Sequence, residues 1–181
     1  MHNKTELRRH LIAERIALDD TQRLAWDNAI ALHVQNILKA RSIKCLGVYW
    51  PIRGEPDLQL MYEELAVHGI ALALPKVEAK DAPLSFVAWT PGEALKKDAY
   101  GTFTPDKPSM AGYPEALLIP CVGFTRERMR LGYGAGYYDR TLAIEPRPYA
   151  IGVGYSRALA EFPPSEYDIA LDVIVTEQAY F

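Results

Sequence analysis

Residues 45–75, CLGVYWPIRGEPDLQLMYEELAVHGIALALP, hold two short apolar runs separated by a helical pattern. The first run, Cys45–Trp50, and the second, Ile70–Leu74, are each followed directly by a proline. Asp57–His68 places apolar residues at helical spacing, and the glycine that follows, Gly69, is typical of a position just past a helix end. Strand, helix and strand in this order predict a βαβ unit, whose two strands lie parallel in one sheet.

The same alternation of strands and helices continues on both sides of this unit. Upstream, helices are expected over residues 4–18 and from Asp20 or Thr21 to about residue 40. Downstream, we expect strands at 84–89, 116–119, 149–153 and 173–175, a helix of about ten residues from Tyr137, and loops at 76–81 and 100–114. The pattern predicts an α/β fold, a single-domain three-layer α/β/α sandwich with a mostly parallel sheet over residues 1–181.

Composition narrows the class of protein. With 181 residues and 49% hydrophobic content, the chain can bury one sizeable core. A formal net charge of −3 gives no basic field for non-specific nucleic-acid binding. The two cysteines, Cys45 and Cys121, share no metal-ligand spacing and fit a reducing cytosol. Apolar runs such as Ile70–Leu74 are far too short to span a bilayer, so we expect a cytoplasmic protein without a membrane or nucleic-acid partner.

Residues 130–140, RLGYGAGYYDR, carry glycine at every second position from Gly132 to Gly136. They follow a predicted strand and open a predicted helix, where glycine permits positive φ and backbone N–H groups can approach a phosphate. The spacing is neither the Walker A pattern nor the dinucleotide fingerprint. A tight structural turn therefore remains an alternative to a phosphate site.

Charged residues flank these glycines. Arg130 can donate two hydrogen bonds to a phosphate, and Asp139 can hold a magnesium ion that bridges phosphate oxygens. Each also has an ordinary interpretation, as a surface arginine and as an acid favoured by the first turn of a helix. The first helix adds Lys4, Arg8 and Arg15 along one line, which is either a phosphate-binding face or a solvated basic face.

The stretch RLGYGAGYYDR, preceded by IPCVGF, closely resembles the signature of the 5-formyltetrahydrofolate cyclo-ligase family, also called 5,10-methenyltetrahydrofolate synthetases. The resemblance extends to three further blocks in the family's order: K-x-x-L-R with a later arginine in the first helix, YWPIRGEPDL at 49–58, and EYDIALDVIVTE at 166–177. Two positions depart from the family pattern, Thr125 in place of a common Asp and Thr104 in place of a Glu before proline. Both leave room for altered loop geometry or substrate preference.

The resemblance implies an activity and a fold. Enzymes of this family convert 5-formyltetrahydrofolate and MgATP into 5,10-methenyltetrahydrofolate, ADP and phosphate. Their fold is related to those of phosphosugar isomerases and coenzyme A transferases. The implied partners are therefore small molecules, with ATP as co-substrate and Mg²⁺ as cofactor, and we expect a monomer.

The resemblance also implies roles for particular residues. Lys4, Arg8 and Arg130 are expected to be catalytic cations on the triphosphate. The ATP site is expected to comprise Lys4, Arg8, Arg130, Leu131, Gly132, Tyr133, Gly134, Ala135, Gly136, Tyr138 and Asp139. The folate site is expected to use Glu55 as the acid facing the pterin and Trp89, Tyr137 and Tyr138 as aromatic walls, although Trp89 fits the core equally well. Asp139 and Asp172 are the expected magnesium ligands.

Two other functions fit parts of the same sequence. A sugar-phosphate isomerase or transferase would share the fold but would need a positioned base near the glycines. A nucleotide- or folate-binding protein without turnover would keep the glycines and the aromatic walls but would not need the magnesium carboxylates. The presence of both Asp139 and Asp172 favours chemistry over binding alone.

Overall fold

A six-stranded sheet forms the centre of the computed structural model, which describes residues 3–181. Its strands, in chain order, are β1 (Cys45–Gly47), β2 (Ala71–Val77), β3 (Leu84–Trp89), β6 (Ala116–Pro120), β9 (Tyr149–Val153) and β10 (Val173–Val175). Their spatial order is β10-β9-β6-β1-β2-β3. All neighbours are parallel except β3, which runs antiparallel to β2. The predicted α/β class with a mostly parallel sheet is confirmed.

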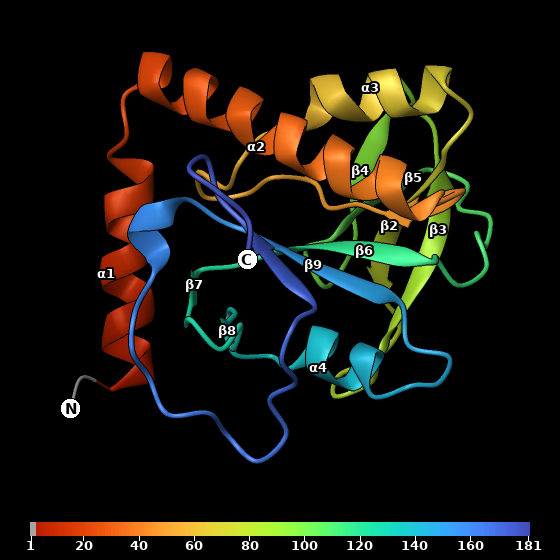
Figure 1. The fold of residues 1–181 in the computed structure, drawn as a ribbon. Coiled ribbons are helices and arrows are strands. Elements are labelled where there is room, and N and C mark those ends of the chain that lie inside the picture. Colours follow the sequence, from red (N-terminus) through yellow and green to blue (C-terminus); the bar gives the residue numbers. More distant parts are fainter. Residues whose placement is uncertain (1–2) are drawn as a thin grey trace.

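Helices cover both faces of this sheet (Figure 1). Helices α2 (Asp20–Arg41) and α3 (Gln59–Val67) lie side by side over one face, and the short helix α4 (Tyr137–Leu142) lies under the other. Every residue of the central strand β6 is buried, as expected of a parallel strand with both faces covered. Leu118 belongs to the core beneath α2 and α3, whereas Leu117 packs with Leu142 of α4.

Helix α1 (Lys4–Ile16) stands apart from these layers, beside the carboxyl ends of the parallel strands (Figure 1). Asn3 caps it by accepting a hydrogen bond from the backbone N–H of Thr5. Its Leu11 packs with Val122, which follows β6, and with Leu131. Ligands of open parallel sheets bind outside the carboxyl ends of the strands, so α1 lies next to the expected site.

Helix starts differ slightly from the sequence expectation. Asp19, rather than Asp20 or Thr21, caps α2, because its Oδ1 accepts the N–H of Gln22 at 2.9 Å. Asp57 lies before α3 and not in it, and its Oδ1 accepts the N–H of Gln59. Among the helices of residues 3–181, none combines the length and the apolar character that crossing a bilayer requires.

Two of the expected loops contain strands. Strand β2 continues through Pro75 to Val77, into the expected loop at 76–81. The pairing of β1 with β2 ends at Ala73, so the missing N–H of Pro75 costs no hydrogen bond to β1. Within the expected loop at 100–114, β5 (Phe103–Pro105) forms a hairpin with β4 (Leu95–Lys97). Neither β4 nor β5 alternates clearly enough between apolar and polar residues for a strand to be predicted there.

The segment between β6 and β9 is also more structured than expected. Strands β7 (Gly123–Phe124) and β8 (Arg130–Leu131) form a small hairpin before the glycines. Helix α4 has six residues, not about ten. It ends before Pro146 and Pro148, which disfavour helical conformation in the residues that precede them. A single turn of 3₁₀ helix (Ser156–Ala158) follows β9.

Candidate active site

Residues 132–136, here called the glycine loop, connect β8 to α4 at the carboxyl side of β6. Gly134 has φ +101° and Gly136 has φ +69°, values that residues with a side chain rarely adopt. Gly136 is the N-cap of α4 and contributes no side-chain hydrogen bond to the first turn. The N–H groups of the loop and of the helix start are therefore available to an anion.

Arg130 packs against the glycine loop. A Cβ at Gly132 would lie 2.1 Å from Nη1 of Arg130, so a side chain there would displace this guanidinium. Nη2 of Arg130 lies 3.2 Å from Oδ2 of Asp139, and the Arg130 side chain is 7% exposed. The guanidinium also lies over the ring of Tyr138, 5.3 Å from its centroid. Arg130 and Asp139 are thus brought together beside the loop.

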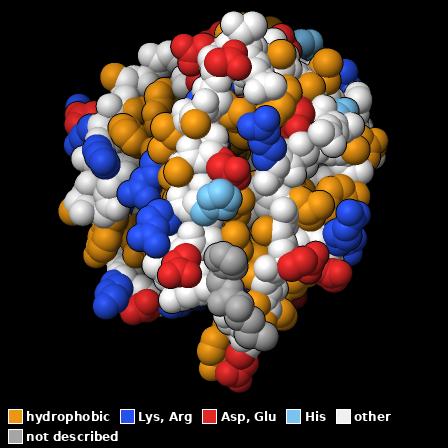
Figure 2. Space-filling model, turned by 90° about the vertical axis from the view of Figure 1, so that its left-hand side faces the viewer, with side chains coloured by type: hydrophobic (Ala, Val, Ile, Leu, Met, Phe, Trp, Pro, Cys, Tyr) orange, Lys and Arg blue, Asp and Glu red, His pale blue; other side chains and the backbone are white. Residues whose placement is uncertain are grey.

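The first helix supplies two more cations, Arg8 at the glycine loop and Lys4 at residues 165–168. Nε of Arg8 donates a 2.7 Å hydrogen bond to the carbonyl of Gly132, and its guanidinium lies near Gly134. Nζ of Lys4 donates to Oγ of Ser165 at 2.8 Å and to Oδ2 of Asp168 at 3.0 Å. Figure 2 views the molecule from the side on which α1 stands, and several Lys and Arg side chains gather on that face.

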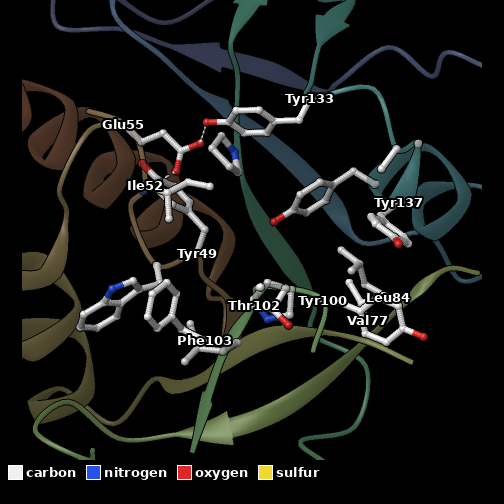
Figure 3. A pocket seen from close by; sticks show the side chains of 18 of the residues that line it. Tyr49, Ile52, Glu55, Val77, Leu84, Tyr100, Thr102, Phe103, Tyr133 and Tyr137 are labelled. Atoms are coloured by element: carbon white, nitrogen blue, oxygen red, sulfur yellow. Dashed lines mark hydrogen bonds between the residues drawn. The ribbon is translucent and has the colours of Figure 1, made fainter. Parts of the chain in front are cut away.

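A cavity lined largely by apolar and aromatic side chains opens on one side of the glycine loop (Figure 3). We call it the aromatic cavity. Its walls come from the loop after β1, from β2 and β3, from the β4–β5 hairpin, from the end of β6, and from β8, the glycine loop and α4. They include Tyr49, Trp50, Ile52, Glu55, Leu84, Tyr100, Phe103, Arg130, Tyr133, Tyr137 and Tyr138. Such a cavity, with few polar groups, suits a flat ring system.

The carboxylate in this cavity is Glu55, which is only 3% exposed. Its Oε1 accepts a 2.6 Å hydrogen bond from the hydroxyl of Tyr133, and its Oε2 accepts the N–H of Ile52 at 3.0 Å (Figure 3). Burial raises the pKa of Glu55, while these hydrogen bonds and the nearby Arg15 lower it. The Tyr133 hydroxyl in turn accepts a 2.8 Å hydrogen bond from Nη2 of Arg15.

A second cavity lies along the glycine loop, and we call it the polar cavity. It is lined by Lys80, Asp81, Gly134, Ala135, Gly136, Tyr137, Asp139, Arg140, Ala143, Ser165, Glu166, Tyr167, Asp168 and Ile169. Residues 134–137 line both cavities, so the glycine loop forms part of the wall of each. Lys4 reaches the polar cavity through its bonds to Ser165 and Asp168. Two ligands could therefore meet at the loop.

Trp89, an expected wall of the folate site, does not line the aromatic cavity and is corrected to a core residue. Its side chain is buried, with ring centroids 6.0 Å from Trp50 and 6.2 Å from Tyr62. Trp50 lines the cavity instead. The pleat of β3 turns Trp89 toward the core beneath α2 and α3, and strands buried on both faces do not reveal this direction in their sequence.

Asp172, an expected magnesium ligand, is not brought to the glycine loop. It lies directly before β10. Its two carboxylate oxygens accept hydrogen bonds from Nη1 of Arg147, at 2.9 and 3.0 Å, and one of them also accepts the N–H of Ala150 at 2.7 Å. These contacts place Asp172 at the amino ends of β9 and β10, whereas Asp139 lies in α4 beside the glycine loop. Among residues 3–181, no three His, Cys, Asp or Glu side chains are grouped as metal ligands.

Sequence reasoning missed the role of Arg15 and the two walls Trp50 and Phe103. Arg15 lies four residues after Leu11 and three before Leu18, on the apolar stripe of α1, and an arginine at such a position is a signal of a buried cation with fixed partners. Phe103 comes from the hairpin that was expected to be a loop. No signal in the sequence favoured Trp50 over Trp89.

Comparison with known proteins identifies the family of this chain. The family model described as the 5-formyltetrahydrofolate cyclo-ligase family matches residues 1–177. The chain belongs to this family. Its members include the 5-formyltetrahydrofolate cyclo-ligase of Mycoplasma pneumoniae, which is 29% identical over 179 residues that cover 97% of this chain and 99% of that protein.

Two solved structures of such enzymes have the same fold. A 5,10-methenyltetrahydrofolate synthetase from Mycoplasma pneumoniae superposes with a TM-score of 0.80 at 27% identity, covering 97% of this chain and 99% of that one. The Aquifex aeolicus 5,10-methenyltetrahydrofolate synthetase gives a TM-score of 0.81 at 30% identity, covering 98% and 91%.

The two departures from the family pattern lie outside the walls of the cavities. Thr125 is buried in the β7–β8 turn, where its hydroxyl accepts the N–H of Met129 at 3.4 Å. Thr104 is buried in β5 beside Phe103, which does line the aromatic cavity. Thr125 thus stabilises the β7–β8 turn. Thr104 is joined to the cavity only through its neighbour Phe103 in β5.

Proposed function

We propose that this chain catalyses the ATP-dependent cyclisation of 5-formyltetrahydrofolate to 5,10-methenyltetrahydrofolate, with release of ADP and phosphate. The observation that carries the proposal is that one glycine loop lines two cavities, one walled largely by aromatic side chains and one that contains several charged side chains. Phosphoryl transfer between two bound molecules requires them to lie next to each other, which a shared wall allows. Membership of the cyclo-ligase family supports the choice of substrates.

The aromatic cavity is the proposed folate site. A pterin is flat and carries adjacent N–H donors, so it needs aromatic contacts and a carboxylate that accepts paired hydrogen bonds. Tyr137, Tyr138 and Trp50 supply the rings, and Glu55 supplies the carboxylate. Glu55 already accepts directional hydrogen bonds, which hold it in a fixed orientation.

The glycine loop and the polar cavity are the proposed nucleotide site. Arg130 makes one side-chain hydrogen bond within residues 3–181, to Asp139, so its other N–H groups can donate to phosphate oxygens. Arg8 and Lys4 add positive charge from α1, and residues 132–136 add backbone N–H groups. Leu131 is buried beneath the loop and fixes its start.

The chemical problem is a poor leaving group. The formyl carbon on N5 is amide-like, and closing N10 onto it would expel an oxygen as hydroxide. In the proposed mechanism the formyl oxygen attacks the γ-phosphorus of ATP, the bond to ADP breaks, and an iminium phosphate forms. N10 then adds to the activated carbon and loses its proton, and the C–O bond breaks to release inorganic phosphate.

The protein contributes positioning and charge more than acid–base catalysis. Phosphoryl transfer needs in-line alignment and neutralised oxygens, which Arg130, Arg8 and Lys4 are placed to provide. Ring closure is intramolecular, and correct positioning can supply an effective molarity of about 10⁵ M. Arg130 lines the aromatic cavity and contacts the glycine loop, so it lies between the two proposed ligands.

Magnesium fits the site with a single protein carboxylate. Mg²⁺ in nucleotide sites is held by one or two carboxylates together with phosphate oxygens and waters. Asp139, next to Arg130 and the polar cavity, is the proposed ligand, and the ion would neutralise charge on the phosphates. Asp172 is not proposed for this role, because it lies at the amino ends of β9 and β10 and not at the glycine loop. We expect the chain to act as a cytoplasmic monomer.

The test is a neutral-pH assay with pure protein, 5-formyltetrahydrofolate, magnesium and ATP. Formation of methenyltetrahydrofolate is followed by its near-ultraviolet absorbance, and ADP is measured in the same samples. We expect both products in equal amounts and no absorbance change without ATP. Absence of methenyltetrahydrofolate, or its formation without ADP, would refute the proposal. The carboxylates of Asp139 and Glu55, beside Arg130 and Tyr133, are both hydrogen-bonded, which does not favour a sugar-phosphate isomerase with either of them as a free base.

A further inference from the structure

A single buried guanidinium joins three segments at the site. Arg15 of α1, which is 6% exposed, donates from Nε to the carbonyl of Arg53 at 3.0 Å and from Nη1 to the carbonyl of Cys121 at 3.3 Å. Its Nη2 donates to the hydroxyl of Tyr133 at 2.8 Å. Arg53 follows β1, Cys121 follows β6, and Tyr133 lies within the glycine loop. Arg15 therefore fixes the loop relative to both central strands.

The hydroxyl of Tyr133 links Arg15 to Glu55 through two hydrogen bonds. The hydroxyl accepts from Arg15, so its own proton is directed to Oε1 of Glu55 at 2.6 Å. Figure 3 shows the two side chains pointing toward each other at the edge of the aromatic cavity. The direction of these two hydrogen bonds is fixed, because an arginine only donates and an ionised carboxylate only accepts.

Arg15 does not itself line the aromatic cavity, whereas Tyr133 and Glu55 do. We propose that Arg15 and Tyr133 are positioning residues, which hold Glu55 ionised and oriented to accept the paired N–H groups of the pterin. This inference rests on the proposed function. Because Tyr133 lies between Gly132 and Gly134, the same contact also fixes the glycine loop against the folate site.

Glu55 depends on these contacts because it is buried. Burial raises its pKa, and the Tyr133 hydroxyl, the Ile52 N–H and the charges of Arg15 and Arg53 lower it. The other titratable groups that interact with it from neighbouring elements are Tyr49, Tyr62, Cys121 and Tyr138. Removing the Tyr133 hydroxyl removes a stabilising donor, so the pKa of Glu55 rises further. The protonated acid is a poor acceptor for paired N–H groups, so folate binding is lost at a higher pH.

The test measures equilibrium binding of 5-formyltetrahydrofolate without ATP, from pH 5 to pH 8, for wild type and Tyr133→Phe. The variant keeps the ring, which packs beneath Arg53 with its centroid 5.4 Å from the guanidinium carbon, and loses only the hydroxyl. We expect binding about tenfold weaker at neutral pH and a pH midpoint of binding that moves upward. Arg15→Lys, which keeps the charge but not the three-way donor geometry, should move the midpoint in the same direction.

Tyr113→Phe is the matched control. It also loses one tyrosine hydroxyl bond, 2.9 Å to the carbonyl of Thr141, and Tyr113 lines neither cavity. We expect wild-type binding and an unmoved midpoint for it. A Tyr133→Phe protein with the wild-type midpoint overturns this inference and leaves the proposed function standing. A wild-type protein that binds no 5-formyltetrahydrofolate overturns the proposed function and the inference together.

Discussion

Arg8 donates a 2.7 Å hydrogen bond to the carbonyl of Gly132 across 124 residues of sequence. This contact joins the first helix to the glycine loop, and it orients the guanidinium so that its remaining N–H groups lie beside Gly134. The proposed phosphate site therefore combines α1 with the glycine loop. It depends on the docking of α1 as much as on the loop itself.

Replacing Arg130 with alanine should weaken catalysis through the phosphate. A charge-assisted hydrogen bond is worth about 1.5–3 kcal/mol, so kcat/KM for ATP should fall by roughly 10- to 100-fold. Arg147→Ala is the control, because it also loses an ion pair. Its partner is Asp172, at the amino ends of β9 and β10 and away from the glycine loop. Steady-state kinetics with both variants checks this prediction. Equal losses in the two variants would show that Arg130 acts only on stability.

Asp139→Asn and Asp172→Asn separate the two expected magnesium ligands. The first change should raise the magnesium concentration needed for half-maximal rate, because a neutral amide is a weaker ligand for a hard cation. The second should leave that concentration unchanged and lower the melting temperature, because it breaks the ion pair with Arg147. Magnesium titrations of the initial rate provide the measurement. A shift with Asp172→Asn would contradict the placement of this residue.

Gly134→Ala tests whether the loop must adopt its observed backbone. Gly134 has φ +101°, and the Cβ that alanine would add there would lie 3.7 Å from the guanidinium of Arg8. Gly112→Ala is matched, because Gly112 has φ +76° and nothing within 4 Å. Each change should cost about 1 kcal/mol of folding stability. Only Gly134→Ala should raise the KM for ATP, and similar kinetics in both variants would argue against a phosphate-binding loop.

Asp27 makes stability depend on pH. Burial raises its pKa from 3.8 to about 6, and the hydrogen bond from Tyr155 lowers it, as does the charge of Arg23. Between these two pH values the folded protein keeps a proton that the unfolded chain has lost, so stability falls as pH rises through this window. Asp27→Asn should therefore stabilise the protein by about 1–2 kcal/mol above pH 6 and have a smaller effect near pH 4.

Urea unfolding at several pH values measures this effect. Asp106→Asn is the control, because the Asp106 side chain is 73% exposed and its partner Lys96 is also exposed. We expect no comparable pH dependence for this control. If Asp27→Asn follows the same stability curve as wild type, the buried carboxyl is not protonated in the folded state over this range.

The sequence was sufficient where the signal is local. The strand, helix and strand at 45–75 were found because apolar spacing and the prolines and glycine at their ends act within a few residues. The approach of Lys4 and Arg8 to the loop was expected from the family resemblance. The sequence alone supplied only their common face on α1.

The sequence was insufficient where the outcome depends on distant partners. Trp89 ends β3 and Trp50 follows β1 by three residues, and only the packing of β3 against α2 and α3 decides which one lines the cavity. The family resemblance implied that Asp172 is a metal ligand, whereas in the structure its carboxylate pairs with Arg147. The direction in which Arg15 donates depends on Arg53, Cys121 and Tyr133, which belong to three separate segments.

The most direct test of the account is a crystal structure with magnesium, a non-hydrolysable ATP analogue and 5-formyltetrahydrofolate. We predict the terminal phosphates against the backbone of residues 132–136 with Lys4, Arg8 and Arg130 around them, and the pterin stacked in the aromatic cavity with its N–H groups on Glu55. Phosphates bound away from the glycine loop, or a pterin that does not contact Glu55, would contradict the central claim that this loop brings the two substrates together.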